Sequence, residues 1–170
     1  AIGERENLTL GHEVVGVVDE VGDAVEDFEH GDRVVVGAIT PDWGSAAAQD
    51  GHPSQSHGPL GGWKFANAKD GVFAEYVHVN EADWNLAHIP QELSDEEAVY
   101  VTDMMSTGFV AAENADIPIG GDVAIFAQGP VGLMATAGAQ LQGAGRIFAV
   151  ETDPNRQELA RLYGADIVID

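Results

Sequence analysis

The sequence predicts an α/β protein in two parts: a β-rich part over residues 1–107, then the first half of a doubly wound parallel sheet over residues 108–170. Three observations support this fold class. Valine-rich segments separated by glycines occupy the beginning of the chain. From Gly121 onward, short apolar runs alternate with helix-like segments. An apolar share of 45% in 170 residues can supply a substantial core.

The first part consists of short β segments, a long loop and a helix. Residues 12–36 carry runs of valine interrupted by glycine, so we expect strands there. Residues 40–70 are rich in Gly, Pro, Ser, Ala and Asn, and this length indicates a functional or irregular loop. Residues 71–79, GVFAEYVHV, alternate like a further strand. Ser94 and Glu97 form a capping box, which predicts that a helix follows.

The second part repeats strand and helix. We expect buried strands and connecting helices, the strands at 122–127, 146–150 and 166–170 and the helices at 133–145 and 153–165. Parallel strands need helical crossovers of this kind. Three strands neither close a sheet nor protect its edges, so we expect the chain to be an internal part of a longer polypeptide that does not fold well or act alone.

The charge of the chain is strongly acidic. The 29 acidic and 7 basic residues leave a net charge of -22, which repels phosphate backbones and anionic lipids. We therefore expect no nucleic-acid partner and no membrane partner. Salt relieves the self-repulsion of such a surface, and the composition resembles that of halophilic proteins. With no targeting segment and no membrane-spanning run, we expect a cytoplasmic protein. The absence of cysteine excludes disulfides and thiolate ligands within these residues.

The segment AQGPVG lies between a predicted strand and a predicted helix, which is the setting of a dinucleotide-binding turn. Gly129 allows close approach of a pyrophosphate, and Gly132 allows tight packing of helix and strand, although Ala127 replaces the usual first glycine. Glu151 ends the next strand, where an acid accepts hydrogen bonds from the ribose of NAD. The expected cofactor contacts are Gly129, Pro130, Val131, Gly132, Glu151 and Thr152. Alternatively, the glycines only serve a tight turn and Glu151 is a surface acid.

His12, Glu13 and Asp103 are candidate metal ligands. Imidazole nitrogen and carboxylate oxygen both bind zinc, and a carboxylate among apolar residues is costly to bury unless it is paired or coordinates a cation. Two other interpretations stay open on local grounds. His12 can be a structural histidine, because adjacent side chains of a strand point to opposite faces and Glu13 would then not share its site. Asp103 can cap a helix that starts at Met104.

Together these motifs resemble those of a known family. GHEVVGVVDEVGDAV fits the zinc-containing alcohol dehydrogenase signature at Gly11, His12, Glu13, Gly16, Gly22 and Val25. Segments such as GDRVVVGAITPDW, GWKFANAKDGVFAEYVHVN, DMMSTGF and GPVGLMA resemble the secondary alcohol dehydrogenases of the tetrameric bacterial and archaeal branch. The resemblance covers essentially the whole chain and implies a partial GroES-like catalytic domain followed by a partial Rossmann domain.

The resemblance also implies a site. His12 and Asp103 would bind one catalytic zinc with Glu13 as an exchangeable ligand, and no structural zinc is expected. The family's cysteine ligand and its proton-relay hydroxyl would fall before Ala1. Thr107 matches a threonine near the nicotinamide. Ala38, Ile39 and Trp63 match the wall of the substrate pocket, although Trp63 can also simply cover the loop beneath it.

The implied function is interconversion of secondary alcohols and ketones, with primary alcohols and aldehydes as further possible substrates, by a homotetramer that uses a nicotinamide cofactor. The best-known relatives prefer NADP and carry a glycine and an arginine where this chain has Glu151 and Asp153, so the residues favour NAD. Two alternatives are a zinc-free quinone or enone reductase of the same superfamily and a non-catalytic nucleotide-binding module.

Overall fold

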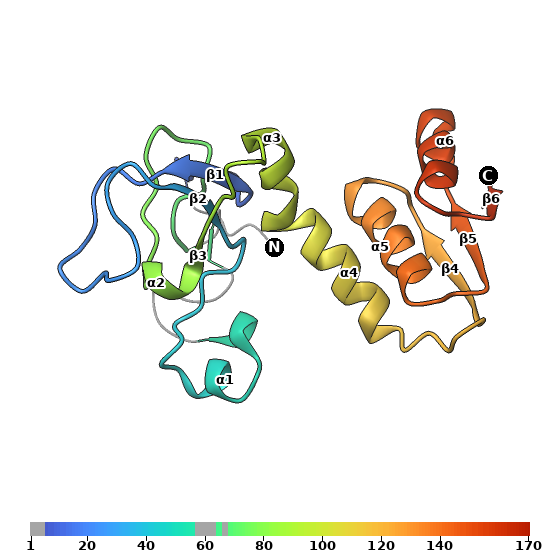
Figure 1. Cartoon of the computed structure of the whole chain (residues 1–170), viewed down its shortest axis with the longest axis horizontal. Coiled ribbons are helices and arrows are strands. Elements are labelled where there is room, and N and C mark those ends of the chain that lie inside the picture. Colours follow the sequence, from blue (N-terminus) through green and yellow to red (C-terminus); the bar gives the residue numbers. More distant parts are fainter. Residues whose placement is uncertain (1–5, 57–63, 66–67) are drawn as a thin grey trace. The chain divides into compact units, whose positions relative to one another are not determined.

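The computed structural model describes residues 6–56, 64–65 and 68–170. The chain divides into two compact units, Ala1–Asp103 and Met104–Asp170, and Figure 1 shows the elements of each. Among the described residues, no helix is long and apolar enough to cross a membrane.

The first unit is built on a small antiparallel sheet. Its strands are β1 (Val14–Val17), β2 (Arg33–Val36) and β3 (Leu86–His88), in the order β1-β2-β3. Val36 pairs with Val14 on one side and with Leu86 on the other, so β2 is the central strand. Val36, Phe65 and Val72 form the buried cluster against this sheet. The β-rich character predicted for this part is confirmed.

One strand assignment from the sequence is wrong, and one strand was not predicted. Residues 71–79 form no strand, because only their first residues pair with a neighbour: the N–H groups of Gly71, Val72 and Phe73 bond to the carbonyls of residues 9–11. Beyond that point the side chains are mostly solvent-exposed, and the ring of Phe73 is 74% exposed. The third strand is instead β3, whose three residues carry too short a pattern to be recognised.

Short helices interrupt the irregular regions of the first unit. α1 (Ala46–Gln49), capped by the Ser45 hydroxyl, and the 3-10 turn η1 (Pro53–Gln55) lie within the long loop, and α2 (Ala82–Asn85) precedes β3. The predicted capping box is present at α3 (Asp95–Ala98), where Ser94 and Glu97 exchange hydrogen bonds. The 3-10 turn η2 (Val99–Thr102) follows and ends at Asp103.

The second unit is a parallel β-α-β-α-β arrangement preceded by a helix, as Figure 1 shows. Its elements are α4 (Met104–Asn114), β4 (Asp122–Phe126), α5 (Pro130–Leu141), β5 (Arg146–Val150), α6 (Pro154–Leu162) and β6 (Ile167–Ile169). The strand order β4-β5-β6 with parallel pairing confirms the predicted doubly wound start. The core consists of Leu133, Ala139, Ile147, Ala149, Ala160 and Ala165.

Two details of the second unit differ from expectation. β4 is not buried on both faces: Val123 and Ile125 pack against the core, whereas Phe126 is 76% exposed, because the core helices cover one face of the sheet. The helix after the glycine turn starts at Pro130, earlier than expected. Proline suits the first helical position, where its missing N–H removes no helical bond.

Candidate functional site

Three potential metal ligands converge in the first unit. His12, Glu13 and Asp103 each offer a ligand atom, and these atoms all lie within 4.8 Å of one another. The His12 imidazole Nε2 lies 2.9 Å from Asp103 Oδ2, and both side chains are partly buried. Asp103 thus turns its carboxylate toward a histidine 91 positions earlier in the chain.

The backbone at Gly11 explains how His12 and Glu13 reach a common centre. They precede β1 instead of lying within it, so the alternation of strand side chains does not separate them. Gly11 has φ +97, and a Cβ there would come within 2.5 Å of the Phe73 ring. The positive φ therefore favours glycine at this position, whereas the exposed Phe73 ring could move away from a Cβ.

The donor set suits a zinc ion. One imidazole nitrogen and two carboxylate oxygens are common zinc ligands, and catalytic zinc sites use three protein ligands in an open shell. Tetrahedral zinc would place its ligand atoms about 3.3 Å apart, so donors already within 4.8 Å need only small side-chain adjustments. The structure brings together the three residues that the sequence singled out.

The expected substrate-wall residues lie close to β2. Ala38 is buried, and its N–H donates to the carbonyl of Thr102 at 3.1 Å, immediately before Asp103. Ile39 is half-buried and lines a small hollow of about 230 Å³ with Trp43 and Val101. Trp63 lies outside the described residues. Thr107 lies on α4 in the second unit with its side chain exposed.

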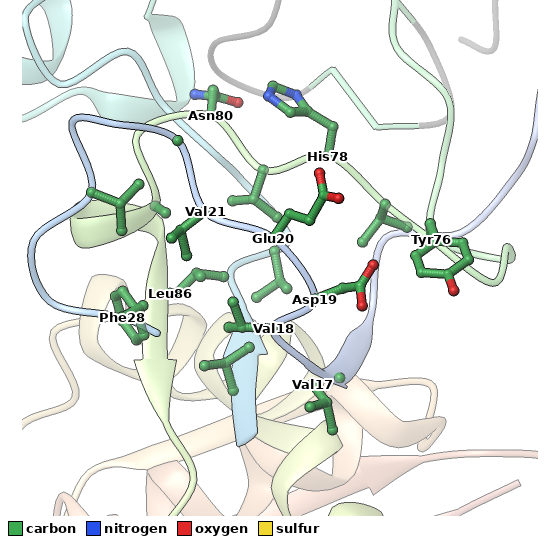
Figure 2. Close-up of a pocket in the computed structure, with 18 of the residues that line it drawn as sticks. Val17, Val18, Asp19, Glu20, Val21, Phe28, Tyr76, His78, Asn80 and Leu86 are labelled. Atoms are coloured by element: carbon green, nitrogen blue, oxygen red, sulfur yellow. The ribbon is translucent and has the colours of Figure 1, made fainter. Parts of the chain in front are cut away.

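A larger hollow of about 1250 Å³ opens elsewhere in the first unit, and Figure 2 shows its lining. Val18, Val21 and Leu86 point into it, and the polar groups of Glu20 and His78 lie together at one side. His12, Glu13 and Asp103 do not line this hollow. The three potential metal ligands therefore lie outside this hollow.

The two glycines of the turn in the second unit differ: the fold requires glycine at Gly132 but not at Gly129. A Cβ on Gly132 would come within 1.9 Å of the Ala127 carbonyl oxygen, so this position must be glycine for the turn to form. Gly129 has an ordinary φ of -71, and a Cβ there would meet nothing within 4 Å. The open space at Gly129 adjoins the N-terminus of α5, where free N–H groups favour an anion. Pro130 and Val131 form the first turn of that helix.

Glu151 is buried, at 7% exposure, contrary to its interpretation as a surface acid. Its Oε1 accepts hydrogen bonds from the N–H groups of Thr152 at 2.8 Å and Asp153 at 2.9 Å. Its Oε2 accepts one from Gln128 N–H at 2.8 Å. The N–H groups of Asp153 and Gln128 hold the pKa of Glu151 below its usual range. Glu151 therefore ties the end of β5 to the glycine turn as an anion.

Sequence reasoning missed the buried polar groups behind this turn. Gln128 is fully buried, and its side chain accepts from the Thr136 hydroxyl at 2.9 Å and donates to the Ile125 carbonyl at 3.3 Å. Helix α4 also packs closely on α5, since a Cβ on Gly108 would come within 2.5 Å of Met134. A glutamine between turn residues gives no local signal of burial, because Gln is mostly exposed in proteins.

Comparison with known proteins places the chain in a family. Residues 2–91 match the family described as the alcohol dehydrogenase GroES-like domain. The chain is 58% identical over 170 residues to the NADP-dependent isopropanol dehydrogenase of Thermoanaerobacter brockii and 54% identical over 170 residues to that of Clostridium beijerinckii. In both comparisons all of this chain aligns with 48% of the relative. The chain thus spans about half the length of these relatives.

Solved structures agree with these sequence matches. Zinc dependent alcohol dehydrogenase 2 from Streptococcus pneumonia has a TM-score of 0.87 and 35% identity, over 96% of this chain and 46% of that one. Alcohol dehydrogenase TADH from Thermus sp. ATN1 has a TM-score of 0.86 and 32% identity, over 99% of this chain and 49% of that one. Both neighbours share the fold of this chain across its two units.

Proposed function

The chain belongs to the alcohol dehydrogenase GroES-like family, and on that premise we propose that it carries the zinc-binding and nicotinamide-binding parts of an enzyme that interconverts secondary alcohols and ketones. The observation that carries this proposal is the convergence of His12, Glu13 and Asp103 in a chain that also has the turn, helix and acid of a dinucleotide site. Neither feature alone would distinguish an alcohol dehydrogenase from a general metal or nucleotide protein.

The residues of the chain would act by binding and orientation. His12 and Asp103 would hold a zinc ion, which would supply Lewis acidity toward an alcohol oxygen, and the glycine turn would hold a nicotinamide cofactor, which would supply the hydride acceptor. The 2.9 Å contact between His12 Nε2 and Asp103 Oδ2 already places the two donor atoms beside each other, and a bound zinc would take the place of a proton between them. Glu13 stands beside them as the third donor. Ala38 and Ile39 would form part of the apolar wall that excludes water from the alcohol carbon, with Trp63 as a further member and Thr107 near the nicotinamide.

We propose NAD as the preferred cofactor, although the relatives from Thermoanaerobacter brockii and Clostridium beijerinckii are named NADP-dependent. Glu151 is held as an anion, and Asp153 adds a second carboxylate two positions later; against these two carboxylates stands one guanidinium, that of Arg156, 3.9 Å from Glu151 Oε2, so a 2′-phosphate would meet net negative charge. Oε2 of Glu151 accepts a single N–H, which leaves it an acceptor site for a ribose hydroxyl.

The test is zinc content and alcohol oxidation by the complete gene product. We expect one zinc per chain, oxidation of 2-propanol, and a kcat/KM at least about tenfold higher with NAD⁺ than with NADP⁺, which corresponds to about 1.4 kcal/mol. Asp103→Asn should lose zinc and activity, whereas Asp23→Asn, the same change at an exposed loop position, should lose neither. Absence of zinc, or of oxidation at every salt concentration, would contradict the proposal.

The cofactor preference has its own variant. Glu151→Gln removes the charge at nearly constant side-chain shape, although its amide NH2 replaces one of the two oxygens that accept backbone N–H groups. We expect it to lower the ratio of NAD⁺ to NADP⁺ activity. Glu158→Gln, at an exposed position on α6, is the matched control and should leave the ratio unchanged. A wild-type preference for NADP⁺ would sink the cofactor proposal and leave the zinc chemistry intact.

We further propose a halophilic, cytoplasmic enzyme that assembles as a homotetramer. The net charge of -22 supports operation at high salt. The tetramer rests on the likeness to tetrameric secondary alcohol dehydrogenases and is tested by light scattering of the purified gene product in 2 M and 0.1 M salt. A monomer in both would contradict it. Cell fractionation tests the location.

A further inference from the structure

Lys69 is a buried cation whose role neither the metal cluster nor the nucleotide turn explains. It is one of two lysines in the chain and is only 8% exposed. Its ammonium donates to the Thr40 hydroxyl at 2.6 Å and to Asn80 Oδ1 at 3.0 Å, and it lies 3.9 Å from the centre of the Phe65 ring. Burying an ammonium among neutral partners is unfavourable, and burial lowers the pKa of Lys69 to about 8.

The partners of Lys69 hold the segment that follows β2. Thr40 is completely buried, and the Asn80 amide donates to the carbonyls of Thr40 and Pro41, both at 3.3 Å. The Asn85 amide donates to the Pro41 carbonyl at 3.1 Å and accepts from the Trp43 indole at 2.9 Å. Residues 37–43 are thus anchored by a continuous, partly buried polar network that ends at the ammonium.

The anchored segment is joined to the candidate metal site. Ala38 and Ile39, the expected substrate wall, lie between β2 and Thr40. The Ala38 N–H binds the carbonyl of Thr102, next to Asp103. Because Val14 pairs with Val36, the start of β1 and the end of β2 share one end of the strand pair, so His12 and Ala38 flank the same end.

We propose that Lys69 is a positioning residue that, through Thr40 and Asn80, holds the wall at residues 37–43 in register with His12 and Asp103 for alcohol binding. This role rests on the proposed function, since it concerns the substrate wall of that same site. In this role the ammonium would act on the position of the wall, through its bonds to Thr40 and Asn80, and not on the reacting atoms. Its contribution is to keep Ala38 and Ile39 in place, since small displacements of a positioned substrate have large effects on rate.

The experiment compares Lys69→Met and Thr40→Val with two controls in the complete gene product. Thr40→Ser keeps the hydroxyl that accepts from Lys69, and Lys64→Met makes the same change at the other lysine. Hydrogen exchange measures how firmly residues 37–43 are held, and it does not require catalytic activity. The probe is the peptide covering these residues, in which the N–H groups of Ala38 and Trp43 are hydrogen-bonded. KM and kcat for 2-propanol read its effect on the reaction.

We expect Lys69→Met and Thr40→Val to speed exchange in residues 37–43 and to raise the alcohol KM on the order of tenfold, with a smaller change in kcat. Lys64→Met should match the wild type. Thr40→Ser keeps the hydroxyl that accepts from Lys69, so it should change the exchange rate and the KM much less than Thr40→Val does, and the affinity for NADH should not change in any of these variants. The proposed anchoring by Lys69 would be contradicted if hydrogen exchange in residues 37–43 of these two variants stayed at the wild-type rate, or if it rose equally along the whole chain. An unchanged KM overturns its link to the substrate. If Lys69→Met does not fold, the two Thr40 variants decide. A wild type without alcohol oxidation would instead refute the proposed function, while the exchange data still test the anchor.

Discussion

Ala127→Gly should stabilise the protein, against the usual effect of introducing glycine. Ala127 has φ +66, in the left-handed region, at the position where dinucleotide-binding turns usually have glycine. The start of α5 packs against Ala127 and so maintains this conformation. The Ala127 carbonyl oxygen lies close to Gly132, in space that a Cβ at that position would need. The Ala127 N–H also bonds to the Val150 carbonyl at 2.8 Å. The chain therefore keeps an alanine in a conformation that its Cβ disfavours.

The size of the effect follows from two opposing contributions. Relief of the left-handed conformation is worth about 1–2 kcal/mol for a residue with a Cβ. Glycine also gives the unfolded chain more freedom, which offsets about 0.4–1 kcal/mol of that gain. The alanine methyl is exposed, so its removal sacrifices little packing. The midpoints of these two ranges leave a rise in the free energy of unfolding of about 0.8 kcal/mol, and their extremes give about 0 to 1.6 kcal/mol.

Urea denaturation followed by circular dichroism measures this change. Ala137→Gly in the interior of α5 is the matched control, and it should lower the free energy of unfolding by about 1 kcal/mol because glycine is a poor helix former. The same substitution is thus expected to have opposite signs at two positions in the same unit. A decrease at both positions would refute the strain at Ala127.

Three further predictions concern the turn, Lys69 and the surface charge. Gly129→Ala should keep the wild-type stability but weaken NADH binding, measured by fluorescence, whereas Gly132→Ala should lower the melting temperature strongly, because its Cβ would clash with the Ala127 carbonyl. Burial lowers the Lys69 pKa from 10.5 to about 8, so between pH 8 and pH 10.5 the unfolded chain binds more protons than the folded chain does. The free energy of unfolding should therefore gain up to about 3 kcal/mol from Lys69 as pH rises from 8 to 10.5, and Lys69→Met should lack this gain. Raising NaCl from 0.1 to 1 M shortens the Debye length from about 10 to about 3 Å, so the melting temperature should rise.

Each of these predictions has a contrary result. Unchanged NADH affinity in Gly129→Ala would mean that the open space at the turn does not receive the cofactor. Equal pH dependence of wild type and Lys69→Met would contradict the burial of a charged lysine. A melting temperature that does not depend on NaCl would show that self-repulsion of the acidic surface is negligible.

Local sequence patterns were sufficient to predict those structural features that depend on residues close together in the sequence. The capping box at Ser94 and Glu97 involves residues three positions apart, and it forms as expected. The parallel unit was also predictable, because each strand and helix after Gly121 has its own apolar pattern and the crossover rule fixes their pairing. Residues 71–79 misled the same reasoning, because alternation shows that a strand can form but not that a neighbouring strand is available.

The sequence alone determined which chemistry the chain can carry: a histidine and carboxylates that suit zinc, a glycine turn with a downstream acid, and a net charge of -22. Only the tertiary structure decided which residues meet. Asp103 reaches His12 across 91 positions, Lys69 reaches Thr40 across 29, and Glu151 is buried at the turn instead of exposed. The physical reason is that a side chain's type is local, whereas its burial and its partners depend on where distant segments of the chain return.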